Sequence, residues 1–151
     1  MTAFDTAWDL MKAPFHGTTT GVLKKIRKRG LQPKRPDAFT SPSVFFSQSP
    51  EQAIAFANIR SDLTRGKYGG DPVLLHFPLS AVKNPNQGLF RPTPEDGDNQ
   101  WTKHPIPASA ITEYYGPPKP QDEEKWDEWQ DAIISWRKEM MERYERGEFD
   151  D

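Results

Sequence analysis

The sequence predicts an α+β domain followed by a C-terminal amphipathic helix. Short runs rich in β-branched and aromatic residues, at 15–18, 43–48 and 72–79, alternate with segments of helical periodicity. A proline-rich stretch at 116–120 then precedes a segment in which tryptophan and aliphatic residues recur every three or four positions. A chain of 151 residues suits one compact domain with a short appendage.

The N-terminal third is expected to contain two helices and one strand. Residues 4–12 read as a short helix that ends before Pro14, and Phe15 to Thr18 form the first strand. A second helix covers about residues 20–29, with a basic outer face that includes Lys24 and Lys28. Gly30 is suited to cap its C-terminus because glycine readily adopts a left-handed conformation.

The middle of the chain supplies the other strands. Residues 43–48 form a strand, and Ser49-Pro50-Glu51-Gln52 begins a helix that runs to about residue 60. The strand at 72–79 is the most apolar, which predicts the centre of the sheet. A long polar loop at 83–99 precedes strands at 100–104 and 112–115, with a turn at 105–111 between them.

The last segment carries an apolar stripe on a helix of roughly 25 residues. We therefore predict a domain at 1–116, a stiff linker at 117–121 and an acidic, tryptophan-rich helix at 122–147. A stripe of this size is expected to pack on the body, on a second copy or on a protein partner. Its residues are Trp126, Trp129, Ile133, Trp136, Met140 and Tyr144.

Charge is distributed unevenly along the chain. Residues 1–120 hold 10 acidic and 15 basic side chains (+5), and residues 121–151 hold 12 and 5 (−7), which sum to the formal charge of −2. A basic body could attract a phosphate-bearing ligand or a nucleic acid. The acidic tail could equally fold over the body and neutralise it.

The composition excludes several classes of chemistry. The chain has no cysteine, which excludes disulfides, thiolate catalysis and cysteine-ligated zinc and favours a reducing compartment. Its three histidines, His16, His76 and His104, lack the spacing of metal ligands, so no metal site is predicted. No apolar run approaches a membrane span and the first residues do not resemble a signal peptide. We expect a cytoplasmic protein with no membrane association.

One short motif stands out as a candidate ligand site. His16-Gly17-Thr18 ends the first strand, where glycine would let a ligand reach the main chain and histidine can donate or accept hydrogen bonds. The chain has no glycine-rich nucleotide-binding loop. A histidine at the end of a strand can also be purely structural.

The order of the motifs resembles the ADP-ribosyltransferase superfamily over about residues 14–115. The His-Gly-Thr strand, a helix ending Gly-Leu, the strand Val-Phe-Phe-Ser, the helix Ser-Pro-Glu-Gln-Ala and a strand leading into Ile-Pro occur in that order. The chain is most similar to the small His-Gly-Thr members: bacterial antibiotic- and DNA-modifying transferases and RNA 2′-phosphotransferases. The resemblance implies two small, bent, split sheets with flanking helices that hold NAD as the substrate.

The resemblance also implies roles for individual residues. His16 would bind the adenosine-side ribose, and Gly17 would offer its main chain to the nicotinamide amide, with Thr18 completing the motif. Phe45 and Ser47 occupy the place of an aromatic-Phe-Ser motif on the second strand, and Phe56 lies where an aromatic often meets the nicotinamide ring. Each phenylalanine could also belong to the ordinary core.

The third catalytic position departs from the family pattern. Gln100 stands where the family usually has a glutamate that holds the nicotinamide ribose and stabilises positive charge as the glycosidic bond breaks. Glutamine can hold the ribose but supplies no negative charge. The nearby acids Glu95 and Asp98 could substitute for it, and Glu113 is further away in sequence.

Three functions follow from this resemblance. The first is NAD-dependent transfer of ADP-ribose to a macromolecular acceptor, either a protein or a nucleic acid, with His16 and Gln100 or Glu95 as the catalytic residues. The second is an inactive binding or inhibitory protein that retains the fold and acts through its acidic C-terminal helix. The third is an RNA 2′-phosphotransferase-like enzyme, which would need several arginines around a phosphate.

Overall fold

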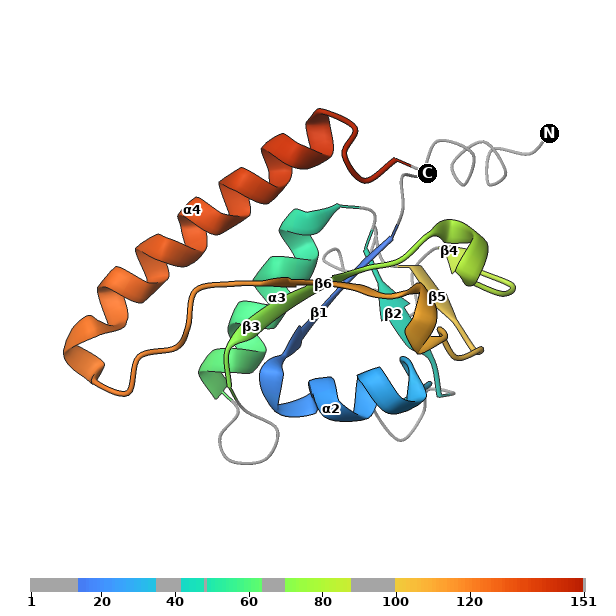
Figure 1. The fold of residues 1–151 in the computed structure, drawn as a ribbon, viewed down its shortest axis with the longest axis horizontal. Helices are drawn as coiled ribbons and strands as arrows, with labels where there is room; N and C mark the ends of the chain where they lie inside the picture. Colours follow the sequence, from blue (N-terminus) through green and yellow to red (C-terminus); the bar gives the residue numbers. More distant parts are fainter. Residues whose placement is uncertain (1–13, 35–41, 48, 64–69, 88–99, 151) are drawn as a thin grey trace.

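The computed structural model describes residues 14–34, 42–47, 49–63, 70–87 and 100–150. These residues form two three-stranded antiparallel sheets and three α-helices, which confirms the predicted α+β class (Figure 1). The helix predicted at 4–12 lies outside the described residues. None of the described helices has both the length and the apolar composition that crossing a bilayer requires.

The first sheet has the strand order β1-β3-β6. It contains β1 (Phe15–Thr19), β3 (Pro72–His76) and β6 (Thr112–Tyr115). The apolar strand β3 lies at its centre, as predicted, and Val73, Leu74 and Leu75 are fully buried. The strand ends at His76, before the predicted residue 79, because the chain turns at Pro78, which has no N–H for the ladder.

The second sheet has the strand order β2-β5-β4. It contains β2 (Val44–Phe46), β5 (Gln100–Thr102) and β4 (Asn86–Gln87), so β2 and β5 are shorter than predicted. The two residues of β4 fall in the segment predicted as a polar loop, and that part of the prediction is wrong. Asn-Gln has neither the length nor the β-branched composition that signals a strand.

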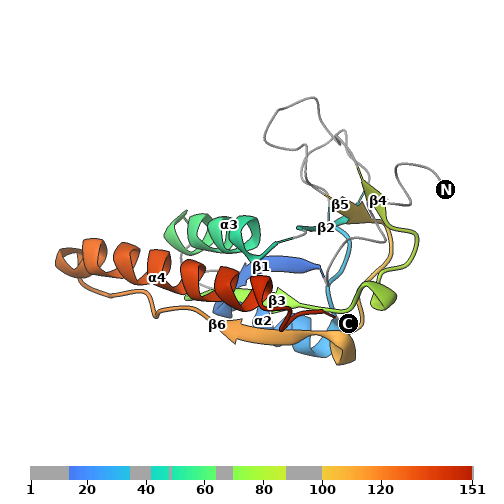
Figure 2. The same cartoon turned by 90° about the horizontal axis from the view of Figure 1, so that it is seen from above.

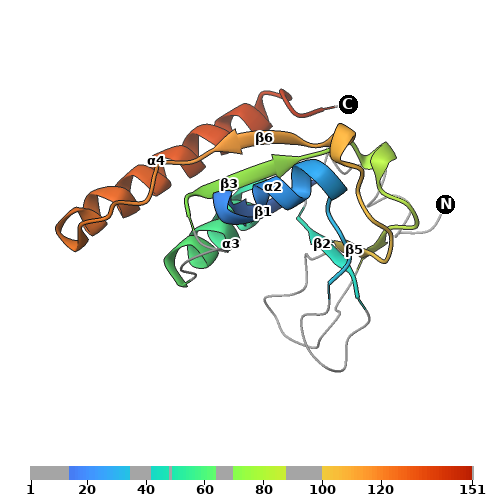
Figure 3. The same cartoon turned by 60° about the horizontal axis from the view of Figure 1, so that its bottom comes forward.

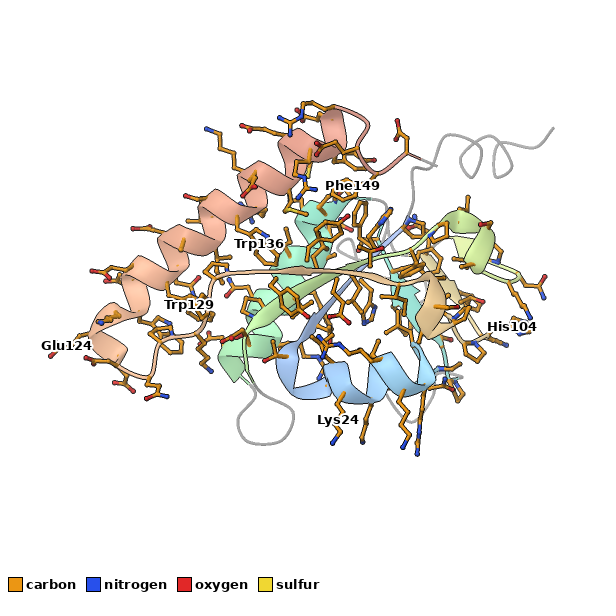
Figure 4. The ribbon with its side chains drawn as sticks, viewed as in Figure 1. Lys24, His104, Glu124, Trp129, Trp136 and Phe149 are labelled. Atoms are coloured by element: carbon orange, nitrogen blue, oxygen red, sulfur yellow. The ribbon has the colours of Figure 1, made fainter. Side chains whose placement is uncertain are left out.

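Helix α2 (Thr20–Arg29) covers the face of the first sheet that turns toward the second sheet. Leu23 and Ile26 pack into a core cluster with Leu75 of β3 and Phe46 of β2. Gly30 has a φ of 74° and its N–H bonds to the Ile26 carbonyl, which confirms the predicted cap. The opposite face of α2 is basic, and Lys24 projects away from the body (Figure 4).

Helices α3 (Pro50–Leu63) and α4 (Trp126–Glu145) cover the other face of the first sheet and lie side by side (Figure 2). The stripe of α4 is buried against Phe15, Ile54 and Leu74 of the same chain, so it packs on the body. Its buried members are Trp129, Ile133, Trp136 and Met140.

The chain continues past the predicted helix end in a way that the sequence did not reveal. Gly147, with a φ of 81°, turns it back, and Phe149 enters the core with 1% of its surface exposed. The Phe149 ring lies 5.0 Å from the Phe15 ring and 5.1 Å from the His76 ring, measured between centroids. Phe149 therefore closes the core beside the first residue of β1 (Figure 4).

Candidate functional site

The two sheets join at Phe15 of β1 and Ser47, which follows β2. The Phe15 N–H donates to the Ser47 carbonyl at 2.9 Å, and the Ser47 N–H donates to the Phe15 carbonyl at 2.8 Å. Continued antiparallel pairing would next bring Gly17 opposite Phe45. Beyond the bridge, however, β2 and β5 diverge from β1, β3 and β6 (Figure 3).

The His16 side chain takes the place of the missing strand pairing. His16 Nδ1 lies 2.6 Å from the Phe45 carbonyl oxygen, the acceptor that the Gly17 N–H would otherwise use. We call the resulting split the seam and define it by Phe15–Gly17 of β1, residues 45–47 and Gln100 of β5.

The hydrogen bond also determines the protonation of His16. A carbonyl oxygen only accepts, so Nδ1 carries the hydrogen and Nε2 remains an acceptor in the neutral ring. Burial lowers the pKa of His16 below 6.5, and the positive charges of Arg60 and Lys34 lower it further, against the opposing effect of the Phe45 bond. His16 is therefore a neutral ring with one acceptor nitrogen at neutral pH.

Gly17 is buried, and its main-chain groups point to the edge of β1 that is not paired with β3. In the ladder with β3, the main-chain groups of His16 and Thr18 point toward β3, so those of Gly17 point away from it. Among the described residues, the Gly17 N–H and carbonyl have no hydrogen-bond partner. One donor and one acceptor therefore lie at the seam.

Glycine is also required at this position by packing. A Cβ on Gly17 would lie 1.9 Å from the Ala53 carbonyl oxygen and 2.9 Å from the Ala57 nitrogen. Helix α3 thus approaches β1 to a distance that no side chain permits. Close packing against α3 explains why residue 17 is a glycine. Its N–H and carbonyl point to the edge of β1 that is not paired with β3.

Gln100 lies on the adjoining strand with an unsatisfied side chain. Its Cα is opposite that of Phe46, so both side chains point to the core face of the second sheet. Gln100 is 0% exposed, and neither its amide nitrogen nor its amide oxygen has a hydrogen-bond partner in the described part of the chain. A buried side chain of this kind costs stability unless a ligand or water completes it.

Two cations that the sequence analysis did not assign to the site influence it. Lys34 pairs with Ser43 through two main-chain hydrogen bonds of 2.9 Å, on the edge of β2 that also faces His16. Arg60 comes from α3, and its guanidinium lies 5.4 Å from the centroid of the Phe56 ring. These two positive charges act on the seam and would favour a phosphate-bearing ligand there. No sequence motif marks these residues, because the tertiary fold brings them together.

The remaining predicted site residues occupy different surroundings. Thr18 is 7% exposed, on the same face of β1 as His16, and Ser47 forms the bridge to Phe15. Phe45 is half-buried and points to the opposite face of β2 from Phe46. Phe56 is 48% exposed on α3, outside the three strands of the seam, although its neighbour Arg60 acts on His16.

Of the acidic candidates, only Glu113 is described, and it does not lie at the seam. Glu113 is on β6, at the far edge of the first sheet from β1, and it accepts hydrogen bonds of 2.7 and 2.9 Å from Arg27. Those bonds lower the pKa of Glu113. Glu95 and Asp98 lie outside the described residues. Within the described ranges, no cluster of histidine and acidic side chains has the composition of a metal site.

Comparison of the chain with family models, curated proteins and solved structures found no match.

Proposed function

We propose that the chain is an ADP-ribosyltransferase-like protein that binds NAD at the seam and transfers ADP-ribose to a macromolecular acceptor. The observation that supports this most strongly is the His16–Phe45 hydrogen bond of 2.6 Å. It lies where the two sheets diverge, leaves His16 Nε2 as an acceptor and accompanies a Gly17 main chain that has no ladder partner among the described residues. These are the groups that the resemblance to this superfamily assigns to NAD.

The chemistry of NAD matches the groups at the seam. A ribose hydroxyl can donate to His16 Nε2, and the nicotinamide carboxamide can pair its donor and its acceptor with the Gly17 peptide. The other ribose can donate a hydroxyl to the Gln100 amide oxygen. The charges of Lys34 and Arg60 favour the pyrophosphate.

The transfer itself breaks one bond and forms another. The bond between the ribose C1′ and the nicotinamide nitrogen breaks, and nicotinamide leaves with the electron pair. A nucleophile on the acceptor bonds to C1′ and releases its proton to solvent. The amide dipole of Gln100 stabilises the developing positive charge less than a carboxylate would, so this transfer would be slow.

Gln100 also favours a second function. Gln100 is neutral, and the described residues of the seam contain no carboxylate. A protein that binds NAD and leaves its glycosidic bond intact would have this site. The two functions share NAD binding and differ in whether nicotinamide is released.

A calorimetric titration with NAD tests the shared step. We expect binding by the wild-type protein and at least a tenfold weakening by His16→Ala, because the variant loses an acceptor for a hydroxyl and the group that holds the seam open. His104→Ala is the matched control, since His104 lies in a turn after β5 and contacts Asn84. Absence of binding at millimolar NAD would overturn both functions.

Nicotinamide release separates the two functions. Gln100→Glu restores the carboxylate and is expected to raise the release rate by about 10²-fold. Gln130→Glu makes the same chemical change on α4 and should have no effect. Wild-type release with transfer of labelled ADP-ribose to acceptors in a cell lysate supports the transferase. Tight NAD binding without release by the wild-type protein supports the second function.

A further inference from the structure

Helix α2 presents a concentrated positive charge to solvent. Five of the six residues from Lys24 to Arg29 are basic, and all five are exposed. We call these side chains the α2 basic face. Lys24 and Lys28 are one turn apart, a rise of about 6 Å along the helix. Successive phosphates of one strand rise about 3.4 Å along the axis of a duplex, so a rise of about 6 Å corresponds to about two such steps.

Most of this charge is not neutralised within the described structure. Arg27 is paired with Glu113, but no described acidic side chain pairs with Lys24, Lys28 or Arg29. Residues 14–34 contain no acidic residue at all. The acidic side chains gather instead on α4, and Figure 4 shows Glu124 far from Lys24. The acidic tail therefore does not cover the α2 basic face.

An exposed aromatic ring lies beside this face. Tyr115 of β6 is 54% exposed and is on the side of the first sheet that α2 covers. Its hydroxyl is hydrogen-bonded to Glu113 and to Arg27, so the side chain is held against the helix. A fixed aromatic ring next to several cations is the combination with which proteins bind unpaired bases and their phosphates.

We infer that the α2 basic face and Tyr115 bind single-stranded nucleic acid. Lys24, Lys28 and Arg29 contact the phosphates, and the Tyr115 ring stacks on a base. A duplex would use the cations and leave Tyr115 without a base to stack on. A membrane is disfavoured because the exposed residues of α2 include no large apolar side chain to enter the lipid.

The surface leads toward the seam. Leu31, which follows α2, pairs with Ile106, and Lys34 pairs with Ser43 next to β2. A strand bound along α2 would extend toward His16, which makes it a candidate acceptor for ADP-ribose. This last step rests on the proposed function, whereas the binding itself does not require NAD.

Fluorescence anisotropy with a labelled single-stranded oligonucleotide of about 20 nucleotides, without NAD, tests the inference. Three phosphate contacts predict that the logarithm of the binding constant falls with the logarithm of salt concentration with a slope of about −2. Lys24→Gln/Lys28→Gln/Arg29→Gln should weaken binding at least tenfold and remove most of that slope. Tyr115→Ala should weaken it about tenfold, and Tyr115→Phe should retain it because the ring remains.

The control variant also removes three positive charges, from lysines outside the α2 basic face. Lys83→Gln/Lys103→Gln/Lys138→Gln changes three exposed lysines outside this surface and should bind like the wild type. Equal weakening by both triple variants, tighter binding of the matching duplex, or equal binding of polyglutamate or anionic lipid vesicles would each overturn the inference. Since the assay contains no NAD, its failure leaves the proposed function untouched. A failed NAD titration would in turn leave the nucleic-acid surface standing.

Discussion

Gln100→Met should stabilise the NAD-free protein, although the substituted side chain is completely buried. Methionine has nearly the length of glutamine and carries no group that must form hydrogen bonds. Gln100 is 0% exposed and both its polar atoms lack partners among the described residues. The wild-type side chain thus carries a desolvation penalty that methionine does not have.

The size of the effect follows from the penalty for unsatisfied polar groups. One such buried group costs about 1–3 kcal/mol. Because the two atoms belong to a single amide and a core can relax around it, we expect a gain of about 2 kcal/mol. For a chain of this size the gain raises the melting temperature by about 4–8 °C. The same substitution should weaken NAD binding, since it removes the proposed partner of a ribose hydroxyl.

Urea denaturation followed by circular dichroism measures the change, with Gln130→Met as the matched control. Gln130 exchanges hydrogen bonds with Asn58, including one of 3.2 Å from the Asn58 amide, so its replacement should lower stability by about 1 kcal/mol. If both substitutions destabilise the protein equally, the Gln100 amide is already satisfied in solution. The argument that it awaits a ligand then fails.

Three further predictions concern the elements around the seam. His16 has a pKa below 6.5 in the folded state. The stability that its neutral form contributes is therefore complete above pH 6.5 and is lost as the pH falls through the folded-state pKa. In denaturation measured from about pH 8 to 5, His16→Gln should remove this pH dependence of the free energy of unfolding. Gly17→Ala would place a methyl group 1.9 Å from a main-chain oxygen of α3 and should destabilise the fold by more than about 3 kcal/mol, whereas Gly21→Ala on the exposed side of α2 should stabilise it by up to about 1 kcal/mol. Phe149→Ala should cost about 3 kcal/mol in urea denaturation because the ring is 1% exposed, and Ile134→Ala, at a side chain 56% exposed, should change stability by less than about 0.5 kcal/mol.

Elements with a strong periodic signal were predictable from the sequence. The stripe of α4 and the apolar run of β3 each place large residues on surfaces that must be buried, and both elements formed, with shorter bounds than predicted. The C-terminal cap at Gly30 was predictable for a local reason, since few other residues adopt its positive φ. These features depend on neighbours in the sequence.

Features that depend on distant contacts were not predictable in the same way. Strand β4 has two polar residues and exists through its pairing with β5. Phe149 follows a glycine turn, and nothing in its neighbours indicates that it returns to a core formed by Phe15 and His76. Lys34 and Arg60 approach His16 from different elements, so their effect on its pKa required the tertiary structure.

The residues of the candidate site came from the resemblance and their role stays a prediction, whereas the divergence of the two sheets had no signal in the sequence. The sequence indicated His16, Gly17 and Gln100, and the topology brings their strands together in the order β1, β2, β5. The sheets diverge where the His16 side chain bonds to a main-chain acceptor of the second sheet. His16 Nδ1 lies at the Phe45 carbonyl, which the Gly17 N–H would reach if the ladder continued.

The seam combines three polar groups that a single ligand could bind. The neutral His16 ring offers Nε2 as an acceptor, and within the described residues the Gly17 main chain lacks ladder partners and the buried Gln100 amide lacks a hydrogen bond. All three lie on adjacent strands, and each is a donor or acceptor that one polar ligand could satisfy. The physical case for a ligand at the seam rests on the proximity of these three groups, and under the proposed function the identity of Gln100 would set the rate of nicotinamide release.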